Sequence, residues 1–235
     1  MTAMPDDAHE LARSLRPQGF GRTRPQRIDD AIVEPAWPGI RVFASVSEGR
    51  VSLWEEGDEV ELFDDDVHEA LSRATEGSLD GGIFDGYVTK QVPTKGIAVL
   101  DPNSDYPTMT SEITRMFVGQ RRSPRVELEM RRRAERAGRV FDEQDVVNLV
   151  LTDLLWLDGQ WLLDVPLLER RRVLESVVNP GPLVRTGLFV RQPIDSWIQS
   201  WRAQGFHGMT FKAANSRYRP GEASNEWAEA DLPRR

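Results

Sequence analysis

The chain has 235 residues and a mass of 26.7 kDa, a length that suits one compact unit or two tightly joined lobes. Hydrophobic residues make up 39% and charged residues 29%, with a mean hydropathy of −0.48, so the chain should fold around a real core beneath a very polar surface. The formal net charge of −8 excludes indiscriminate electrostatic binding of nucleic acid by the whole molecule. Any such binding needs a local basic patch.

Several residue types are scarce enough to limit the chemistry. The absence of cysteine excludes disulfides, thiolate metal sites and thiol catalysis. The three histidines show no zinc-ligand spacing: His9, His68 and His207. Twenty-seven arginines face only three lysines, which are therefore the only candidate amine nucleophiles: Lys90, Lys95 and Lys212. No run approaches the roughly 20 apolar residues of a membrane span and the start is acidic, so we expect a cytoplasmic protein with no membrane partner.

The first part of the chain predicts an arm followed by strands. Residues 1–29 hold many helix breakers, which indicates a short helix over 8–15 and then an extended, loosely held arm before a main domain at 30–235. Alternating residues predict a hairpin with strands over 39–46 and 50–54. A helix that follows three aspartates and runs through about residue 75, and a long strand over 82–92, complete this half.

A polar helix is predicted between Pro124 and Gly138. It and its end carry six arginines: Arg125, Arg131, Arg132, Arg133, Arg136 and Arg139. Two interpretations are open. The arginines belong to a solvated face with ion pairs inside the helix, or they form a patch that binds an anion or nucleic acid.

The most apolar part of the chain begins at Val146. It predicts a buried strand to Leu157, a tight turn at Asp158 and Gly159, and a return strand. Helices are predicted from Pro166 and Pro193, and strands over 208–213 and near Trp227. Because strands joined by hairpins pair antiparallel, this mixture predicts an α+β fold.

Four segments occur in the order of a known family. VEPAWPGIRV resembles the nucleophile motif E-x-K-x-D-G-x-R, and SLDGGIF resembles the strand motif L-D-G-E. LLWLDGQWLLDVPLLERRRVLESVV resembles a central strand, hairpin and helix, and GFHGMTFKAANSRYRPG resembles G-L-E-G-V-V-x-K followed by Y-R-P-G. Together they resemble the adenylation domain of bacterial ATP-dependent DNA ligases, particularly those of end joining. The resemblance implies an ATP-grasp-like nucleotidyltransferase fold of two antiparallel sheets flanked by helices, here without the OB-fold that normally follows.

In that family a lysine attacks the α-phosphorus of ATP, carboxylates hold Mg²⁺, and an aromatic ring stacks on adenine. This sequence departs from the pattern at six positions. Ala36 replaces the nucleophilic lysine, Pro38 the aspartate and Glu56 the arginine. Gly82 and His207 replace the two glutamates, and Thr152 replaces the stacking ring. Three residues are kept as candidates for a residual nucleotide pocket: Glu34, Arg41 and Lys212. The resemblance therefore implies a catalytically inactive member of the family that needs no cofactor. We expect it to act as a binding or regulatory module in the context of DNA repair. Its partner would be a protein, or nucleic acid bound on the arginine patch.

Two other functions stay open. The chain could be a nucleotidyltransferase that uses ATP and Mg²⁺ with a relocated nucleophile among Lys90, Lys95 and Lys212. It could also be a noncovalent nucleotide sensor, which the loss of the stacking ring and the metal ligands disfavours.

Overall fold

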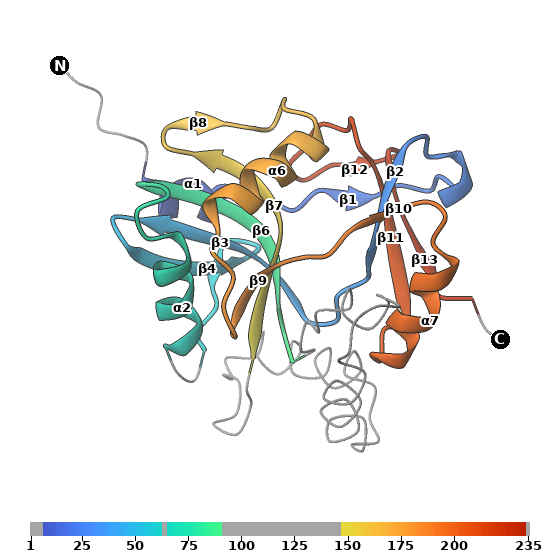
Figure 1. Cartoon of the computed structure of the whole chain (residues 1–235). Coiled ribbons are helices and arrows are strands. Elements are labelled where there is room, and N and C mark those ends of the chain that lie inside the picture. Colours follow the sequence, from blue (N-terminus) through green and yellow to red (C-terminus); the bar gives the residue numbers. More distant parts are fainter. Residues whose placement is uncertain (1–6, 63–64, 91–146, 234–235) are drawn as a thin grey trace.

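The computed structural model describes residues 7–62, 65–90 and 147–233. Two β-sheets stand side by side in it, each covered by helices (Figure 1). No helix in these ranges is long and apolar enough to cross a membrane. The predicted helix that begins at Pro124, its six arginines and Lys95 lie outside the described residues.

The larger sheet has the strand order β5-β4-β3-β6-β7-β8, with β9 paired in parallel to β7. Its strands are β3 (Ile40–Ser47), β4 (Arg50–Glu55), β5 (Asp58–Glu59), β6 (Gly81–Thr89), β7 (Asn148–Leu157), β8 (Gln160–Trp161) and β9 (Val184–Thr186). The predicted hairpins are confirmed: β3 pairs antiparallel with β4, and β7 with β8 across the turn at Asp158 and Gly159. Both turn residues have positive φ (45° and 87°), which suits the Asp-Gly pair.

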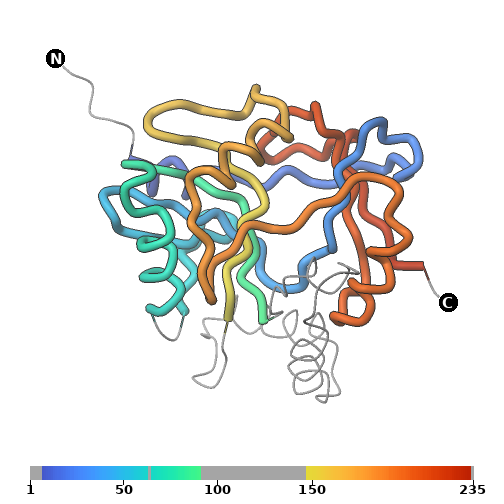
Figure 2. The backbone as a smooth tube through the Cα atoms, in the orientation of Figure 1, coloured from blue at the N-terminus to red at the C-terminus, as the bar shows by residue number. Residues whose placement is uncertain are grey.

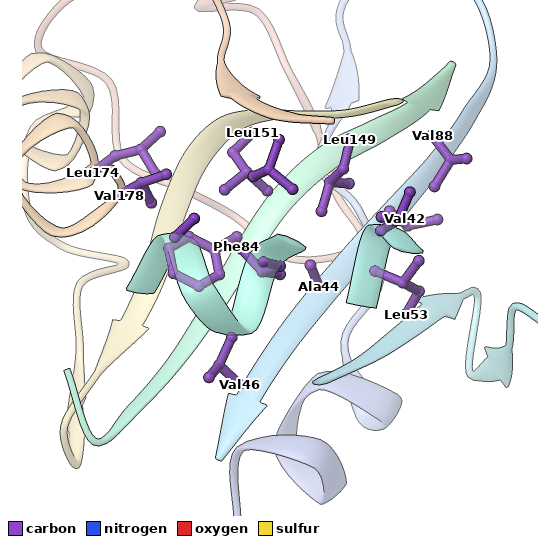
Figure 3. Close-up of a cluster of buried hydrophobic side chains, with 14 of the residues drawn as sticks. Val42, Ala44, Val46, Leu53, Phe84, Val88, Leu149, Leu151, Leu174 and Val178 are labelled. Atoms are coloured by element: carbon purple, nitrogen blue, oxygen red, sulfur yellow. The ribbon is translucent and has the colours of Figure 1, made fainter. Parts of the chain in front are cut away.

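One face of this sheet forms the main core. Helices α2 (Asp66–Thr75) and α6 (Leu167–Val177) cover it, and their apolar sides contribute Leu71 and Leu174. Alternate residues of the strands, such as Val42, Phe84 and Leu151, point into the same cluster (Figure 3). The helix and strand periods predicted from the sequence thus meet on one buried surface.

The smaller sheet has the order β10-β2-β11-β13 and pairs antiparallel throughout. Its strands are β2 (Ala31–Pro35), β10 (Val190–Arg191), β11 (Gly208–Ala213) and β13 (Trp227–Asp231). Helix α7 (Asp195–Ala203) covers the outer face, where Trp201 packs with Val33 and Phe211. The α+β class and the two sheets flanked by helices are confirmed, although β9 adds a parallel pair to the larger sheet.

The N-terminal arm is bound to the rest of the protein. Helix α1 (Ala8–Ser14) buries Ala8 and Ala12 against the larger sheet, on the face opposite the main core. Strand β1 (Gly19–Phe20) then pairs in parallel with β12 (Ala223–Ser224), and the short 3₁₀ turn η1 (Pro25–Arg27) leads to β2 (Figure 2). The expectation of a loosely held arm is wrong, because two buried alanines let α1 pack closely on the sheet.

The Asp158 side chain closes the β7–β8 turn onto the start of β6. Its Oδ1 accepts from the backbone N–H groups of Asp80 and Gly81, both at 2.9 Å. We expect Asp158→Ala to lower the free energy of unfolding by about 2 kcal/mol, because two donors lose their acceptor and alanine fits positive φ poorly. Asp158→Asn keeps an acceptor and tolerates this φ, so it should lose much less in urea denaturation. Equal losses would contradict this role.

Candidate nucleotide cleft

The retained polar residues lie between the two sheets. On β2, Val33 packs in the outer cluster, so Glu34 points the opposite way, toward the larger sheet. From the other side, Arg41 of β3 and Asp85 of β6 project from the face of the larger sheet that does not form the main core. Tyr218 and Trp227 close the space between them, since both pack in one cluster with α1 and the larger sheet.

Glu34 and Lys212 form a buried ion pair on neighbouring strands. Lys212 Nζ lies 2.5 Å from Glu34 Oε2 and 4.7 Å from the centre of the Trp227 ring. Only 1% of Glu34 and 4% of Lys212 is exposed. The β2–β11 pairing places Thr210, two residues before Lys212, directly opposite Glu34. The structure therefore brings together two of the three residues kept from the sequence resemblance, but engages them with each other.

A third charged group, Arg171 of α6, reaches the same carboxylate from the main-core side. Its Nη1 lies 3.5 Å from Glu34 Oε1 and donates to the carbonyl of Thr152 at 2.5 Å, and its Nη2 donates to the carbonyl of Gly187. The guanidinium also lies 5.1 Å from the centre of the Phe189 ring. Sequence analysis did not single out Arg171. It is one of three consecutive arginines, and such a sequence is typical of a solvent-facing helix surface.

Arg41 has different partners from Glu34. Its Nε and Nη2 donate to the two oxygens of Asp85 at 2.9 and 2.5 Å, and its Nη1 donates to the backbone carbonyl of Gln18 in the arm at 2.7 Å. The Tyr218 hydroxyl donates to Asp85 Oδ2 at 2.7 Å. Although burial alone raises the pKa of the Asp85 carboxyl, the Arg41 guanidinium and the Tyr218 hydroxyl hold it below its ordinary value.

Ala36 lies where β2 ends, next to the start of β11. Its N–H donates to the carbonyl of Gly208 at 2.9 Å, and a Cβ on Gly208 would lie 3.2 Å from the Ala36 Cβ. His207, just before Gly208, is exposed, and Pro38 is buried. The structure thus places three of the predicted degenerate positions within one short stretch of the β2–β11 end of the cleft.

Two further degenerate positions, Glu56 and Gly82, lie away from this end of the cleft. Glu56 is exposed in the turn between β4 and β5. Gly82 pairs with Val46 near the far end of β3, and a Cβ on it would meet the Phe84 ring at 3.0 Å, on the side of the main core. A side chain at residue 82 would therefore point away from the face that bears Arg41 and Asp85.

Tyr87 is the residue of β6 that lies beside Arg41, and sequence analysis did not single it out. The two are directly paired across β3 and β6, and the hydroxyl is within electrostatic reach of Asp85, Glu34 and Glu229. The sequence does contain a signal for Tyr87: it follows a second Asp-Gly pair, Asp85 and Gly86, five residues after the Asp80-Gly81 pair that was matched to the L-D-G-E motif. A phenol thus occupies the cleft-facing place on this strand.

Several buried polar atoms around the cleft make no hydrogen bond with the described residues. They are Glu34 Oε1, Trp37 Nε1, Arg171 Nε and Thr210 Oγ1. Neighbouring contacts connect their residues: Arg171 lies against Glu34 and Gly187, Trp37 Nε1 lies 3.5 Å from the Cβ position of Gly187, and Thr210 is opposite Glu34. Buried polar atoms without a partner are costly, so these atoms require a further hydrogen-bond partner such as water.

Among the described residues, the carboxylate kept from the sequence resemblance is already engaged by basic groups. No group of three histidine, aspartate or glutamate side chains in the described ranges could hold a metal ion. The Glu34 carboxylate is neutralised by Lys212 and approached by Arg171, whereas Mg²⁺ requires free oxygen ligands.

Comparison with known proteins agrees with this architecture. A model of the family described as ATP dependent DNA ligase domain matches residues 60–229, so the chain belongs to this family. It is 33% identical over 98 residues to a DNA ligase of Methanocorpusculum labreanum, a match that covers 41% of this chain and 18% of that protein. It is 32% identical over 75 residues to the multifunctional non-homologous end joining protein LigD of Mycolicibacterium smegmatis, covering 32% of this chain and 10% of LigD.

Among solved structures, the ligase domain of LigD from M. tuberculosis has the same fold. The TM-score is 0.59 at 20% identity, and the alignment covers 93% of this chain and 60% of that chain. A mycobacterial DNA ligase D complexed with ATP and MES aligns with a TM-score of 0.60 at 18% identity, over 92% of this chain and 60% of that one. The expected adenylation-domain fold is confirmed. The matched regions make up 18% of the Methanocorpusculum labreanum ligase, 10% of LigD and 60% of each of the two solved chains.

Removal of Asp85 should be more damaging than removal of its tyrosine partner. Asp85→Ala leaves the largely buried Arg41 guanidinium without its carboxylate, and we expect a loss of about 4 kcal/mol in the free energy of unfolding. Tyr218→Phe removes the hydrogen bond donated to the Asp85 carboxylate and the longer bonds accepted from Gln18 N–H (3.2 Å) and Arg41 Nη2 (3.5 Å), and should cost about 2 kcal/mol. Urea denaturation of both variants tests this order, and a loss for Asp85→Ala no larger than for Tyr218→Phe would refute it.

The cleft tyrosines should titrate late. Burial, and then the Asp85 charge, raise the pKa of Tyr218 well above 10.0, and burial raises the pKa of Tyr87 to about 12. Because the folded values lie above the unfolded ones, the stabilisation from these protons is complete below about pH 10 and is lost as the pH rises toward the folded pKa values.

The measurement is absorbance at 295 nm for the wild type and for Tyr218→Phe. At pH 11 the two native proteins should show equal phenolate absorbance, whereas in urea they should differ by one tyrosine. A native difference with a midpoint near pH 10 would show that Tyr218 is not perturbed.

Proposed function

We propose that this chain is a catalytically inactive member of the DNA ligase family that acts as a binding or regulatory module. The observation that carries the proposal is Ala36, whose side chain ends at Cβ at the position that the sequence resemblance assigns to the attacking lysine. A methyl group has no lone pair, so no phosphoramidate can form there.

A relocated nucleophile is poorly supported at Lys212. An amine must be neutral and free to attack phosphorus, but Lys212 Nζ lies 2.5 Å from Glu34 and over the Trp227 ring. Both contacts occupy the amine, which would have to leave them before it could reach a phosphorus atom. Lys90, at the end of β6, is described but makes other interactions, and Lys95 lies outside the described residues.

The absence of a cofactor requirement belongs to the same proposal. The residual candidates Glu34, Arg41 and Lys212 each hold a partner from the protein itself, so binding of ATP with Mg²⁺ would have to break buried ion pairs. Thr152 in place of an aromatic ring removes the stacking surface.

The biological context is drawn from the relatives. Those matched include DNA ligases and LigD, an end-joining protein, so we place this module beside DNA repair. A protein partner is the simplest ligand for an acidic module, and nucleic acid remains open for the arginine-rich segment 125–139. The cytoplasmic location stays a prediction from the sequence.

Noncovalent nucleotide binding is the second candidate. It is favoured by the unpaired polar atoms of Glu34, Trp37, Arg171 and Thr210 around one cleft. Their donors and acceptors could recognise the edge of a base or a ribose without any chemistry at phosphorus.

Incubation with α-labelled ATP or GTP and Mg²⁺ or Mn²⁺, followed by denaturing electrophoresis, tests the main proposal. We expect no labelled band for the wild type or for Ala36→Lys, because a new lysine alone restores neither the stacking ring nor the metal ligands. A wild-type band that disappears in Lys90→Ala or Lys212→Ala would overturn the proposal. Calorimetry with the same nucleotides separates the second candidate, which requires micromolar binding that weakens in Thr210→Val.

A further inference from the structure

A basic hollow lies at the junction of the N-terminal arm and the smaller sheet. Its volume is about 420 Å³, and it is lined by Arg22, Thr23, Arg24, Arg27 and Asn225. Arg22 and Arg24 come from the segment between β1 and η1, Arg27 ends η1, and Asn225 comes from the turn between β12 and β13. This segment continues from β1 toward the smaller sheet in the blue part of the chain (Figure 2).

The backbone holds the two sides of the hollow together. The Gly21 N–H donates to the carbonyls of Ser224 and Trp227 at 2.8 and 2.9 Å. A Cβ at Gly21 would lie 2.5 Å from the Ser224 carbonyl oxygen and 2.6 Å from Asn225 Oδ1, so only glycine allows this approach. Arg22 therefore begins directly beside Asn225, and the hollow is a built feature of the fold.

The three guanidinium groups of the hollow are exposed and carry no ion pair or side-chain hydrogen bond with the described residues. Five other arginines differ: Arg73, Arg172 and Arg191 each pair with a carboxylate, and Arg170 and Arg171 are buried among acceptors. The nearest acidic residues in sequence, Asp29 and Glu226, do not line the hollow. In a chain of net charge −8, three unneutralised arginines around one concavity are a local positive site.

The hollow is separate from the nucleotide cleft. Ile28, which follows η1, packs in the cluster on the outer face of the smaller sheet, whereas Glu34 and Lys212 project from the opposite face. A ligand in the hollow would therefore contact neither the cleft ion pair nor Ala36.

We propose that this hollow, formed by Arg22, Arg24, Arg27 and Asn225, binds phosphate groups. The guanidinium fork matches the oxygens of a phosphate in a bidentate manner, and the Thr23 hydroxyl and the Asn225 amide add neutral donors. The phosphate belongs either to a nucleic-acid strand or to a small free anion, and the inference holds whether or not the neighbouring cleft is inactive.

The experiment compares two triple variants of the full chain with equal charge change. Arg22→Gln/Arg24→Gln/Arg27→Gln removes the site, and Arg50→Gln/Arg73→Gln/Arg172→Gln removes three exposed arginines of other elements. Binding is measured with a fluorescent single-stranded oligothymidylate at several salt concentrations, and with pyrophosphate by calorimetry.

Loss of the site should weaken binding at least about tenfold relative to the control triple, because charge-assisted hydrogen bonds are lost. If the ligand is a nucleic-acid strand, the loss appears with the oligonucleotide. The magnitude of the slope of log K against log salt concentration then falls by about 2, because each of three lost phosphate contacts contributes about 0.7. If it is a free anion, the loss appears with pyrophosphate alone. Equal binding of both probes by the two triple variants would overturn the proposal.

Gly21→Ala gives an independent check that keeps all three arginines. It should displace the arm from Asn225 and weaken binding of the same probe, whereas Gly181→Ala has nothing within 4 Å of the added Cβ and should leave binding unchanged. Circular dichroism establishes that each variant is folded.

Discussion

A single buried carboxylate, that of Asp85, connects three parts of the chain. Through two bonds it holds Arg41 of the adjacent strand, through a third it accepts from Tyr218 of the loop after β11, and Arg41 in turn holds the carbonyl of Gln18 in the arm. Removing one partner would leave a largely buried charge without its counter-charge, so the arm, the larger sheet and the C-terminal loop adopt their positions together.

The same principle bears on the proposal that the chain is a catalytically inactive member of its family. Under that proposal, the charged groups of the cleft serve to pair with one another: Lys212 with Glu34, and Arg41 with Asp85. Alanine at residue 36 removes the attacking group, and the paired side chains keep the scaffold satisfied without a ligand. Selection for stability alone would retain such pairs, because each is costly to break and none requires a nucleotide.

Local sequence signals predicted most of the regular elements. The alternation through Val42 and Val46, the Asp158-Gly159 turn and the apolar side of the helix after Pro166 all specify structure within a few residues. The short strands β1, β5, β9, β10 and β12 were missed, since two or three residues carry no period. Strand β2 was missed as well, because its pairing comes from distant segments. The burial of α1 was missed for the same reason, because its small residues look weakly apolar until a sheet is placed against them.

By itself the sequence determined the fold class, the family and the absence of a lysine at residue 36, because these depend on residue order and identity. Only the tertiary structure decided which charges meet. It paired Glu34 with Lys212 and Arg41 with Asp85, turned residue 82 toward the core, and brought Tyr87 beside Arg41. Such contacts depend on strand register and on which face a side chain takes, and a shift of one residue would reverse both.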